Sequence, residues 1–231
     1  MESQNVKKAI IPIAGVGTRF LPLSKTVPKE LWPLCDKPLI QYIVEEAVAS
    51  GIQEIIFVVS TARSLVLDYF KKTPPKVEKL LKERKKEHLL ESLKNLTELL
   101  KNVSFSFVQE REPLGDGHAV LQARRLVGEE PCAVLFNDDI VESKTPCLKQ
   151  LTEIFKTCGK PVLALHRLPK ERLPFYGIVG VEKIASRLFK IKKIVEKPAV
   201  EEAPSDLTIV GKYILTPEVF DELKKLTPNA K

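Results

Sequence analysis

Two glycines, an arginine and a lysine near the start of the chain could bind phosphate groups. Gly15 and Gly17 lie in the segment Gly15–Arg19, and without a Cβ atom they let the backbone turn sharply and approach a ligand. Successive N–H groups in such a turn attract anions. The Arg19 guanidinium offers a planar set of donors that suits phosphate oxygens. Lys29 follows between Pro28 and Glu30, so the spacing predicts a phosphate-binding loop with two cations.

This loop matches neither of the two common phosphate-binding motifs. A dinucleotide-binding fingerprint needs a third glycine at position 20, where the chain has Phe20. A P-loop needs Gly-Lys followed by Ser or Thr, which is absent. A simple turn with solvated surface cations is the alternative interpretation of the same residues.

Asp138 and Asp139 could bind a divalent cation. They follow the apolar run Ala133–Phe136 and Asn137, so a strand would deliver two carboxylates at its end. Hard cations such as Mg²⁺ prefer oxygen ligands of this kind. Asn-Asp-Asp is also typical of an ordinary turn, and spacing alone leaves both interpretations open.

Apolar runs alternate with helical patterns along most of the chain. The runs that predict strands are Ala9–Ala14, Glu54–Ser60, Val103–Val108, Ala133–Phe136 and Val162–His166, and the helical patterns are Leu39–Ser50, Ser64–Phe70, Ala119–Val127 and Leu148–Thr157. The alternation predicts an α/β fold: a Rossmann-like, mixed and mostly parallel sheet covered by helices on both faces. Ligands of such sheets bind at the carboxyl ends of strands, where the Gly15 loop and Asp138 both lie.

The remaining segments depart from this alternation. Residues 76–101 carry a helical apolar stripe with mixed Lys and Glu on the other faces, which predicts a helical insertion. After Leu173 the apolar runs are short, which predicts short strands in a mixed part of the sheet, and Pro217 predicts the start of a last helix. Pro12 cannot donate a ladder hydrogen bond, so we expect it at the end of the first strand. We expect residues 1–231 to form a single domain.

Composition bounds the class of protein. The 231 residues are 44% hydrophobic and 29% charged, which is ordinary for a soluble globular chain. No apolar stretch is long enough for a membrane span, the first residues lack a signal-peptide core, and the four cysteines form no ligand pattern, so we expect a cytoplasmic protein. The net charge of +7 comes without basic-aromatic alternation, and it favours a polyanionic small substrate over nucleic acid.

The chain resembles the sugar-phosphate nucleotidyltransferase family from about Val6 to Thr227. The motifs that carry the resemblance are Gly15–Pro22, Pro28–Glu30, Asp36–Ile40, Pro113–Ala119, Tyr176-Gly177, Val195–Pro198 and Val210–Tyr213. Within that family, the enzymes that act on UTP and glucose 1-phosphate are the most similar. The resemblance implies the nucleotide-diphospho-sugar transferase fold, formation of UDP-glucose and pyrophosphate with Mg²⁺ as cofactor, and a homo-oligomer.

The resemblance also implies roles for individual residues. The implied catalytic residues are Arg19, Lys29 and Asp138, with Asp138 as the metal ligand. The implied nucleotide-binding residues are Ala14, Gly15, Gly17, Thr18, Glu110, Leu114 and Gly115. The implied residues for the sugar phosphate are Gly177, Glu196, Lys197, Val210 and Gly211.

Three features depart from the family pattern. Glu110 stands where the family has a glutamine that reads uracil, and a carboxylate can accept from the N3–H group but cannot donate to a carbonyl. Asn137 replaces the usual residue before the metal-binding aspartate. The family continues past the position of Lys231 with a second metal-binding aspartate, so we expect a shortened C-terminal part. Two alternatives follow: a nucleotidyltransferase for another nucleotide or sugar 1-phosphate, or a non-catalytic nucleotide-sugar-binding protein.

Overall fold

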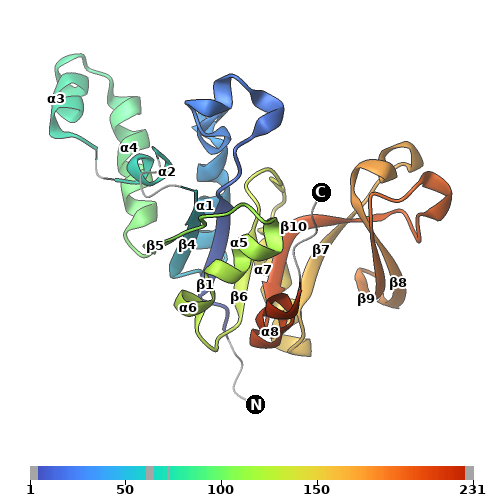
Figure 1. Ribbon diagram of the computed structural model, residues 1–231. Helices are drawn as coiled ribbons and strands as arrows, with labels where there is room; N and C mark the ends of the chain where they lie inside the picture. The colour runs from blue at the N-terminus through green and yellow to red at the C-terminus, as the bar shows by residue number, and fades with distance from the viewer. Residues whose placement is uncertain (1–4, 61–64, 72, 227–231) are drawn as a thin grey trace.

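The computed structural model describes residues 5–60, 65–71 and 73–226, shown in Figure 1. The strands are β1 Lys8–Ile13, β2 Pro33–Leu34, β3 Lys37–Pro38, β4 Glu54–Val59, β5 Ser104–Gln109, β6 Cys132–Leu135, β7 Val162–Arg167, β8 Gly177–Ala185, β9 Leu188–Glu196 and β10 Leu207–Leu215. The helices are α1 Leu39–Ala49, α2 Leu65–Tyr69, α3 Pro75–Glu83, α4 Glu87–Leu100, α5 Asp116–Gln122, α6 Arg124–Val127, α7 Cys147–Cys158 and α8 Pro217–Lys225. Ser64 and Thr227, which bound two of the expectations above, lie outside the described residues.

One mixed sheet of eight strands forms the centre of the described chain. Its order is β5-β4-β1-β6-β10-β8-β9, and β7 pairs with β10 beside this path. The first four of these strands are parallel, and β10 is antiparallel to β6, β7 and β8. The predicted mixed α/β sheet is therefore confirmed. Its parallel part comes from the alternating first half of the chain, and its antiparallel part includes β7, which precedes Leu173, as well as the strands that follow Leu173.

Helices cover both faces of the parallel part because its strands are apolar on both sides. Ala9, Ile11 and Ile13 of β1 belong to the core cluster that also holds buried residues of α1 and α7. Ile10 belongs to the second cluster, which contains residues of α5 and Phe220 of α8. Successive side chains of a strand point to opposite faces, so β1 contributes to both cores.

Pro12 lies at the next-to-last position of β1, as predicted. Its neighbour on one side is Val58 of β4, while the pairing with β6 on the other side runs only from Lys8 to Ile10. At Pro12 the strand is therefore no longer paired with β6, so the missing N–H group of proline leaves no gap in that pairing.

One expected helix and two expected strands have different bounds in the structure. The single helix expected over Ala119–Val127 begins earlier, at Asp116 after Gly115, and it is divided into α5 and α6 at Ala123. The strands β8 and β9 each have nine residues and pair along their length, although their polar outer parts predicted only short strands. The pairing of β8 with β9 supplies the backbone hydrogen bonds that these polar segments need.

Two parts of the chain extend away from the parallel strands β5, β4, β1 and β6 in Figure 1. Residues 76–101, predicted as a helical insertion, form most of α3 and α4, and none of the residues in these two helices is buried. The β8–β9 ribbon extends on the opposite side. Among the described residues, none of the helices has both the length and the apolar character needed to cross a bilayer.

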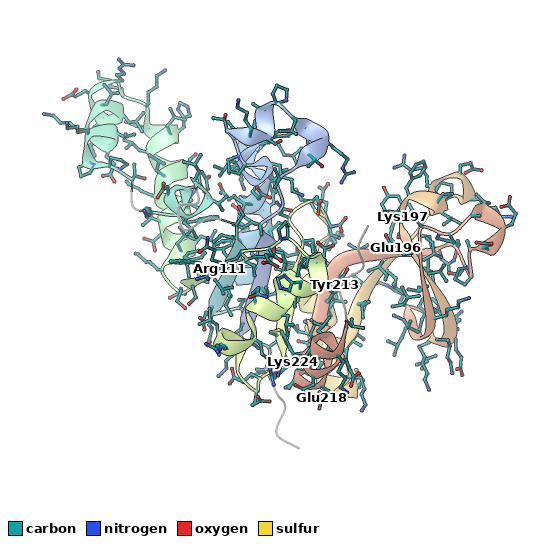
Figure 2. The ribbon with its side chains drawn as sticks, viewed as in Figure 1. Arg111, Glu196, Lys197, Tyr213, Glu218 and Lys224 are labelled. Atoms are coloured by element: carbon teal, nitrogen blue, oxygen red, sulfur yellow. The ribbon has the colours of Figure 1, made fainter. Side chains whose placement is uncertain are left out.

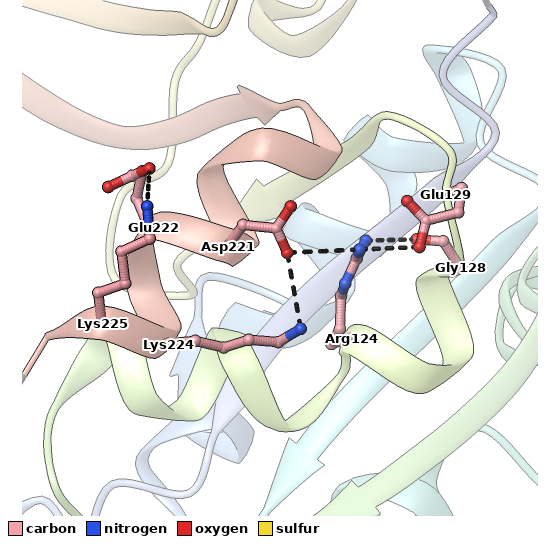
Figure 3. A network of polar contacts seen from close by, with 7 residues as sticks. All are labelled: Arg124, Gly128, Glu129, Asp221, Glu222, Lys224 and Lys225. Atoms are coloured by element: carbon pink, nitrogen blue, oxygen red, sulfur yellow. Dashed lines mark hydrogen bonds and ion pairs between the residues drawn. The ribbon is translucent and has the colours of Figure 1, made fainter.

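Helix α8 is held against α5 and α6 by the apolar side chains of Val219, Phe220 and Leu223 and by a polar network. Phe220 is fully buried, and the Arg124 guanidinium carbon lies 5.4 Å from the centre of its ring. Figure 3 shows Arg124 donating to the Gly128 carbonyl at 2.7 Å and to Glu129 at 2.8 Å, and facing Asp221 at 3.8 Å. The last described helix is therefore fixed to the helix that follows Gly115.

A buried ion pair connects α1, α7 and β10. The Lys212 side chain on β10 is fully buried, and its Nζ atom lies 2.9 Å from Glu46 Oε2 on α1. Glu46 Oε1 accepts a hydrogen bond of 2.9 Å from the backbone N–H of Leu148, in the first turn of α7. A single carboxylate thus pairs with the charge of a buried ammonium group, whose Nζ atom has no hydrogen-bond partner among the described residues, and accepts from a free N–H group of a helix start.

We predict that Glu46→Ala lowers the free energy of unfolding by about 3–5 kcal/mol, because it leaves the Lys212 charge buried and unpaired. The measurement is unfolding by urea, followed by circular dichroism.

Glu83→Ala is the matched control, since it removes the same side chain from an exposed pair with Lys79 at 3.9 Å. We expect a change of at most about 0.5 kcal/mol for this variant. A similar small effect for both variants would show that the buried pair does not contribute to stability.

Candidate active site

The first site segment is the turn that follows β1. Gly17 has φ +65°, a left-handed conformation that glycine adopts without strain, and the 3₁₀ turn η1 (Thr18–Phe20) follows it. The Ser24 hydroxyl donates to the Gly17 carbonyl at 2.9 Å. Gly15 and Arg19 are exposed, so their donors are accessible to a ligand.

Lys29 lies beside this turn and reaches the acid at the end of β6. A Cβ atom on Gly17 would lie 4.0 Å from Lys29 Cδ, so the lysine stem passes close to the glycine. Lys29 Nζ donates to Asp138 Oδ2 at 3.1 Å. The Asp138 side chain is 56% exposed, which leaves its carboxylate open to a further ligand. The loop cation and the predicted metal ligand therefore meet at the carboxyl ends of β1 and β6.

A buried hydrogen bond lies next to this ion pair. Glu30, 1% exposed, accepts a hydrogen bond of 2.8 Å from the Asn137 side-chain amide, and Asn137 is 2% exposed. Burial raises the pKa of Glu30, and hydrogen bonds from its own backbone and from Asn137 partly offset this rise.

Asp139 has a structural contact instead of an open carboxylate. Its Oδ2 atom accepts a hydrogen bond of 2.6 Å from the backbone N–H of Gly211. A Cβ atom on Gly211 would come within 2.7 Å of that oxygen and of Phe136 Cβ. Only glycine therefore allows β10 to approach the end of β6 this closely.

A cavity of about 220 Å³ opens at this edge of the sheet. Its lining residues are Asp116, Phe136, Asp138, Asp139, Gly177, Glu196, Ile209, Gly211 and Tyr213. The cavity thus brings together four of the residues implied by the resemblance, Asp138, Gly177, Glu196 and Gly211. Arg19, Lys29, Lys197 and Val210 are not part of its lining.

Two of these residues come from the β8–β9 ribbon. Gly177 and Glu196 are register partners, and a Cβ atom on Gly177 would lie 3.1 Å from Glu196 Oε2. Lys197 has φ +45° and its Nζ atom lies 3.3 Å from Glu196 Oε1. Figure 2 shows Glu196 and Lys197 side by side at the ribbon and Tyr213 on β10.

Asp116 and Tyr213 are cavity residues that the sequence interpretation did not assign to the site. Burial, followed by the carboxylates of Asp139, Asp116 and Glu196, raises the pKa of Tyr213 to about 12, so its hydroxyl stays protonated and can donate. Burial and the nearby Asp138 carboxylate raise the pKa of Asp116. The available signals were the position of Asp116 directly after Gly115 and that of Tyr213 in the motif Val210–Tyr213.

The segment implied to bind the base lies at the end of β5 and the start of α5. Glu110 is 5% exposed, and its Oε1 atom lies 2.7 Å from His118 Nδ1. The other ring nitrogen of His118 lies 2.9 Å from Gln122 Nε2. Gly115 has φ +107° and precedes α5, while Leu114 is 43% exposed. Glu110 thus has a fixed polar partner in this fold.

Asp138 is the residue best placed to hold a metal ion. Within the described residues, no group of three or more His, Cys, Asp or Glu side chains could hold a metal by itself. A Mg²⁺ ion is commonly bound by one or two carboxylates together with substrate phosphates and water. An exposed Asp138 beside the Gly17 turn fits that kind of site.

A second depression, of about 500 Å³, lies on α4 and is lined by Glu87, Leu90, Glu91, Lys94 and Asn95. It contains none of the residues implied above. We assign the active site to the edge of the sheet because cations, carboxylates and glycine turns converge there.

Comparisons with known proteins show the family to which this chain belongs. The profile of the nucleotidyl transferase family matches residues 8–231. A UTP–glucose-1-phosphate uridylyltransferase of Bacillus subtilis strain 168 is 42% identical over 222 residues, covering 96% of this chain and 75% of the relative. One from Staphylococcus saprophyticus is 44% identical over 220 residues, with coverages of 95% and 75%.

Solved structures of UDP-glucose pyrophosphorylases have the same fold. One in complex with UDP-glucose is 36% identical with a TM-score of 0.85, covering 97% of this chain and 81% of that one. A UTP-bound enzyme from Acinetobacter baumannii is 36% identical with a TM-score of 0.85, with coverages of 95% and 77%. The chain spans about three quarters of the length of the first relatives. This chain therefore belongs to the nucleotidyl transferase family, in the group of the UTP–glucose-1-phosphate uridylyltransferases.

Proposed function

We propose that this protein is a UTP–glucose-1-phosphate uridylyltransferase that forms UDP-glucose and pyrophosphate. The observation that carries the proposal is the 3.1 Å contact between Lys29 Nζ and Asp138 Oδ2, next to the Gly17 turn and the cavity at the strand ends. A phosphate-binding turn, a cation and a metal-binding acid are the parts that nucleotidyl transfer needs. The test is release of pyrophosphate from UTP in the presence of glucose 1-phosphate.

The reaction requires positioning and charge stabilisation, without a covalent enzyme intermediate. A phosphate oxygen of glucose 1-phosphate attacks the α-phosphorus of UTP, and the bond between that phosphorus and the oxygen bridging to the β-phosphorus breaks. The attacking phosphate is already ionised near neutral pH, so no general base is needed. Holding the two phosphates in line and stabilising the charge that develops between them supply the rate enhancement.

The turn after β1 is the proposed site of the UTP phosphates. The backbone around Ala14, Gly15, Gly17 and Thr18 would face the phosphate chain, since two glycines allow close approach. Arg19 would meet the charge that develops on the leaving pyrophosphate. Lys29 would stabilise charge on the α-phosphate.

The cavity is the proposed site of the sugar. Glu196 would accept hydrogen bonds from sugar hydroxyls, and Lys197 would hold the sugar phosphate. Gly177, Val210 and Gly211 would line the sugar site with backbone groups. The protonated Tyr213 hydroxyl adds a donor on β10.

A divalent cation, which we propose to be Mg²⁺, would be held by Asp138 and the nucleotide phosphates. When bound, it neutralises phosphate charge and polarises the reacting phosphoryl group. Asp138 would hold the cation, and the neighbouring Lys29 amine would add a second positive charge for the phosphates.

The proposed base site contains Glu110, Leu114 and Gly115, and Glu110 favours a second candidate function. A carboxylate accepts from the N3–H group of uracil but cannot donate to its carbonyl oxygens. It can accept from the amino group of cytosine. A transferase with a relaxed preference between UTP and CTP is therefore the second candidate, and a panel of nucleotides in the pyrophosphate assay decides between them.

We predict that Lys29→Ala lowers kcat by about 100-fold or more, as expected when one preorganised donor to a developing charge is lost. Steady-state pyrophosphate release with UTP and glucose 1-phosphate measures the effect. Lys156→Ala, which removes a lysine paired with Glu153 on the surface of α7, is the control and should keep wild-type kcat. Equal turnover of Lys29→Ala and wild type would remove Lys29 from the mechanism.

We predict that Glu110→Gln raises kcat/KM for UTP roughly tenfold relative to that for CTP, because the amide adds a donor for a uracil carbonyl. Competition between the two nucleotides in one assay gives this ratio directly. The control is Glu112→Gln, the same change at an exposed position two residues away. An unchanged ratio in Glu110→Gln would show that position 110 does not read the base.

A further inference from the structure

Two adjacent residues of one segment bind two adjacent residues of another. Lys29 and Glu30 lie in the 3₁₀ turn η3 (Lys29–Leu31), while Asn137 and Asp138 follow β6. The Lys29–Asp138 contact of 3.1 Å is half-exposed, and the Glu30–Asn137 hydrogen bond of 2.8 Å is buried. The pairs join segments more than 100 residues apart, with the buried bond directly behind the exposed one.

The turn that carries Lys29 is anchored to the core by Leu31, which packs against the cluster of buried residues from β1, α1 and α7. Its backbone hydrogen bonds from Leu31 to Pro28 and from Trp32 to Lys29 are local and do not join it to the sheet. Asn137, by contrast, is fixed at the end of a central strand, and the preceding Phe136 N–H donates to Gly211 at 2.8 Å. The Glu30–Asn137 bond therefore connects a short turn to the rigid sheet.

Burial of both side chains restricts the geometry of the Glu30–Asn137 hydrogen bond. A buried carboxylate or amide without a partner is costly, so the two side chains have to stay in contact. Asn137, directly before Asp138 in the chain, is the buried partner on the side of the sheet. Its amide supplies the donor that the buried Glu30 carboxylate needs.

We propose that Glu30 and Asn137 are positioning residues that hold the Lys29 amine and the Asp138 carboxylate at a fixed separation for phosphate and metal binding. This inference rests on the proposed function, because it assigns Lys29 and Asp138 to that chemistry. Neither Glu30 nor Asn137 touches the substrates. Glu30 acts by fixing the position of Lys29, which precedes it in the chain, and Asn137 acts by fixing the position of Asp138, which follows it.

Loss of this bond should affect turnover more than sugar binding. We expect Glu30→Ala and Asn137→Ala each to lower kcat roughly 10- to 100-fold, since a misplacement of about 1 Å costs rates of this order. The KM for glucose 1-phosphate should change less than about threefold, because Glu196 and Gly177 are untouched. Glu30→Gln keeps an oxygen that accepts from the Asn137 amide, and it should retain kcat within about threefold.

The test is a double-mutant cycle with one stability control. Glu30→Ala, Asn137→Ala and the double variant are compared with wild type in the pyrophosphate assay, and the double variant should be no slower than the slower single one. Phe155→Leu creates a loss of packing in α7, where Phe155 is 2% exposed and belongs to the hydrophobic core, outside the residues assigned to the site. This control should lower the melting temperature while leaving kcat unchanged.

A second readout does not depend on turnover. Titration of Mn²⁺ with UTP by calorimetry measures nucleotide and metal binding directly, and Glu30→Ala should weaken it about tenfold while Glu30→Gln and Phe155→Leu should not. Absence of turnover in wild type would refute the proposed function, and the calorimetric comparison would still decide the positioning role. Wild-type kcat and wild-type Mn²⁺–UTP affinity in Glu30→Ala, or purely additive effects in the double variant, would overturn the inference.

Discussion

The attraction between Lys29 and Asp138 brings the two halves of the proposed chemistry to one place. The cation comes from the loop after β1, the anion from the end of β6, and their atoms lie 3.1 Å apart. The cation is needed because the adjacent cavity is lined by carboxylates, including those of Asp116 and Glu196, which repel phosphates. A site that accepts two polyanionic substrates must supply positive charge at its edge, and Lys29, Arg19 and a bound divalent cation are the sources that this arrangement offers.

Two kinds of ion pair serve different purposes in this fold. The pair between Lys212 and Glu46 is buried, so it resists any rearrangement of α1, α7 and β10. The pair between Lys29 and Asp138 is partly exposed, and exposed pairs contribute about 0–1 kcal/mol. A phosphate or metal ion can therefore displace it at little cost. The buried pair involves Lys212, the residue directly after Gly211 on β10. The exchangeable pair of Lys29 and Asp138 is at the exposed strand ends, where we propose that the ligands bind.

Much of this fold could be predicted from local patterns. The continuous apolar runs of β1 and β4 predicted buried parallel strands, and the rule for strand ends placed the Gly15 turn and Asp138 together. The lengths of β8 and β9 could not be obtained this way, because their polar residues satisfy the backbone only through pairing with each other. Asp116 was missed for a related reason: its role in the cavity depends on residues from β6, β9 and β10, which no local pattern relates to α5.

Asn137 and Glu110 are two residues whose partners are visible only in the folded chain. Asn137 reads as turn chemistry by itself, yet its partner is Glu30, 107 residues away, and both are buried. Glu110 reads as a lost donor to the base, yet the structure gives its carboxylate a partner in His118, which in turn contacts Gln122. In both cases a polar side chain in the interior is acceptable only because a second one satisfies it. A substitution of Asn137 or Glu110 therefore also leaves its partner, Glu30 or His118, without this hydrogen bond. Its effect on the site depends on how that partner rearranges.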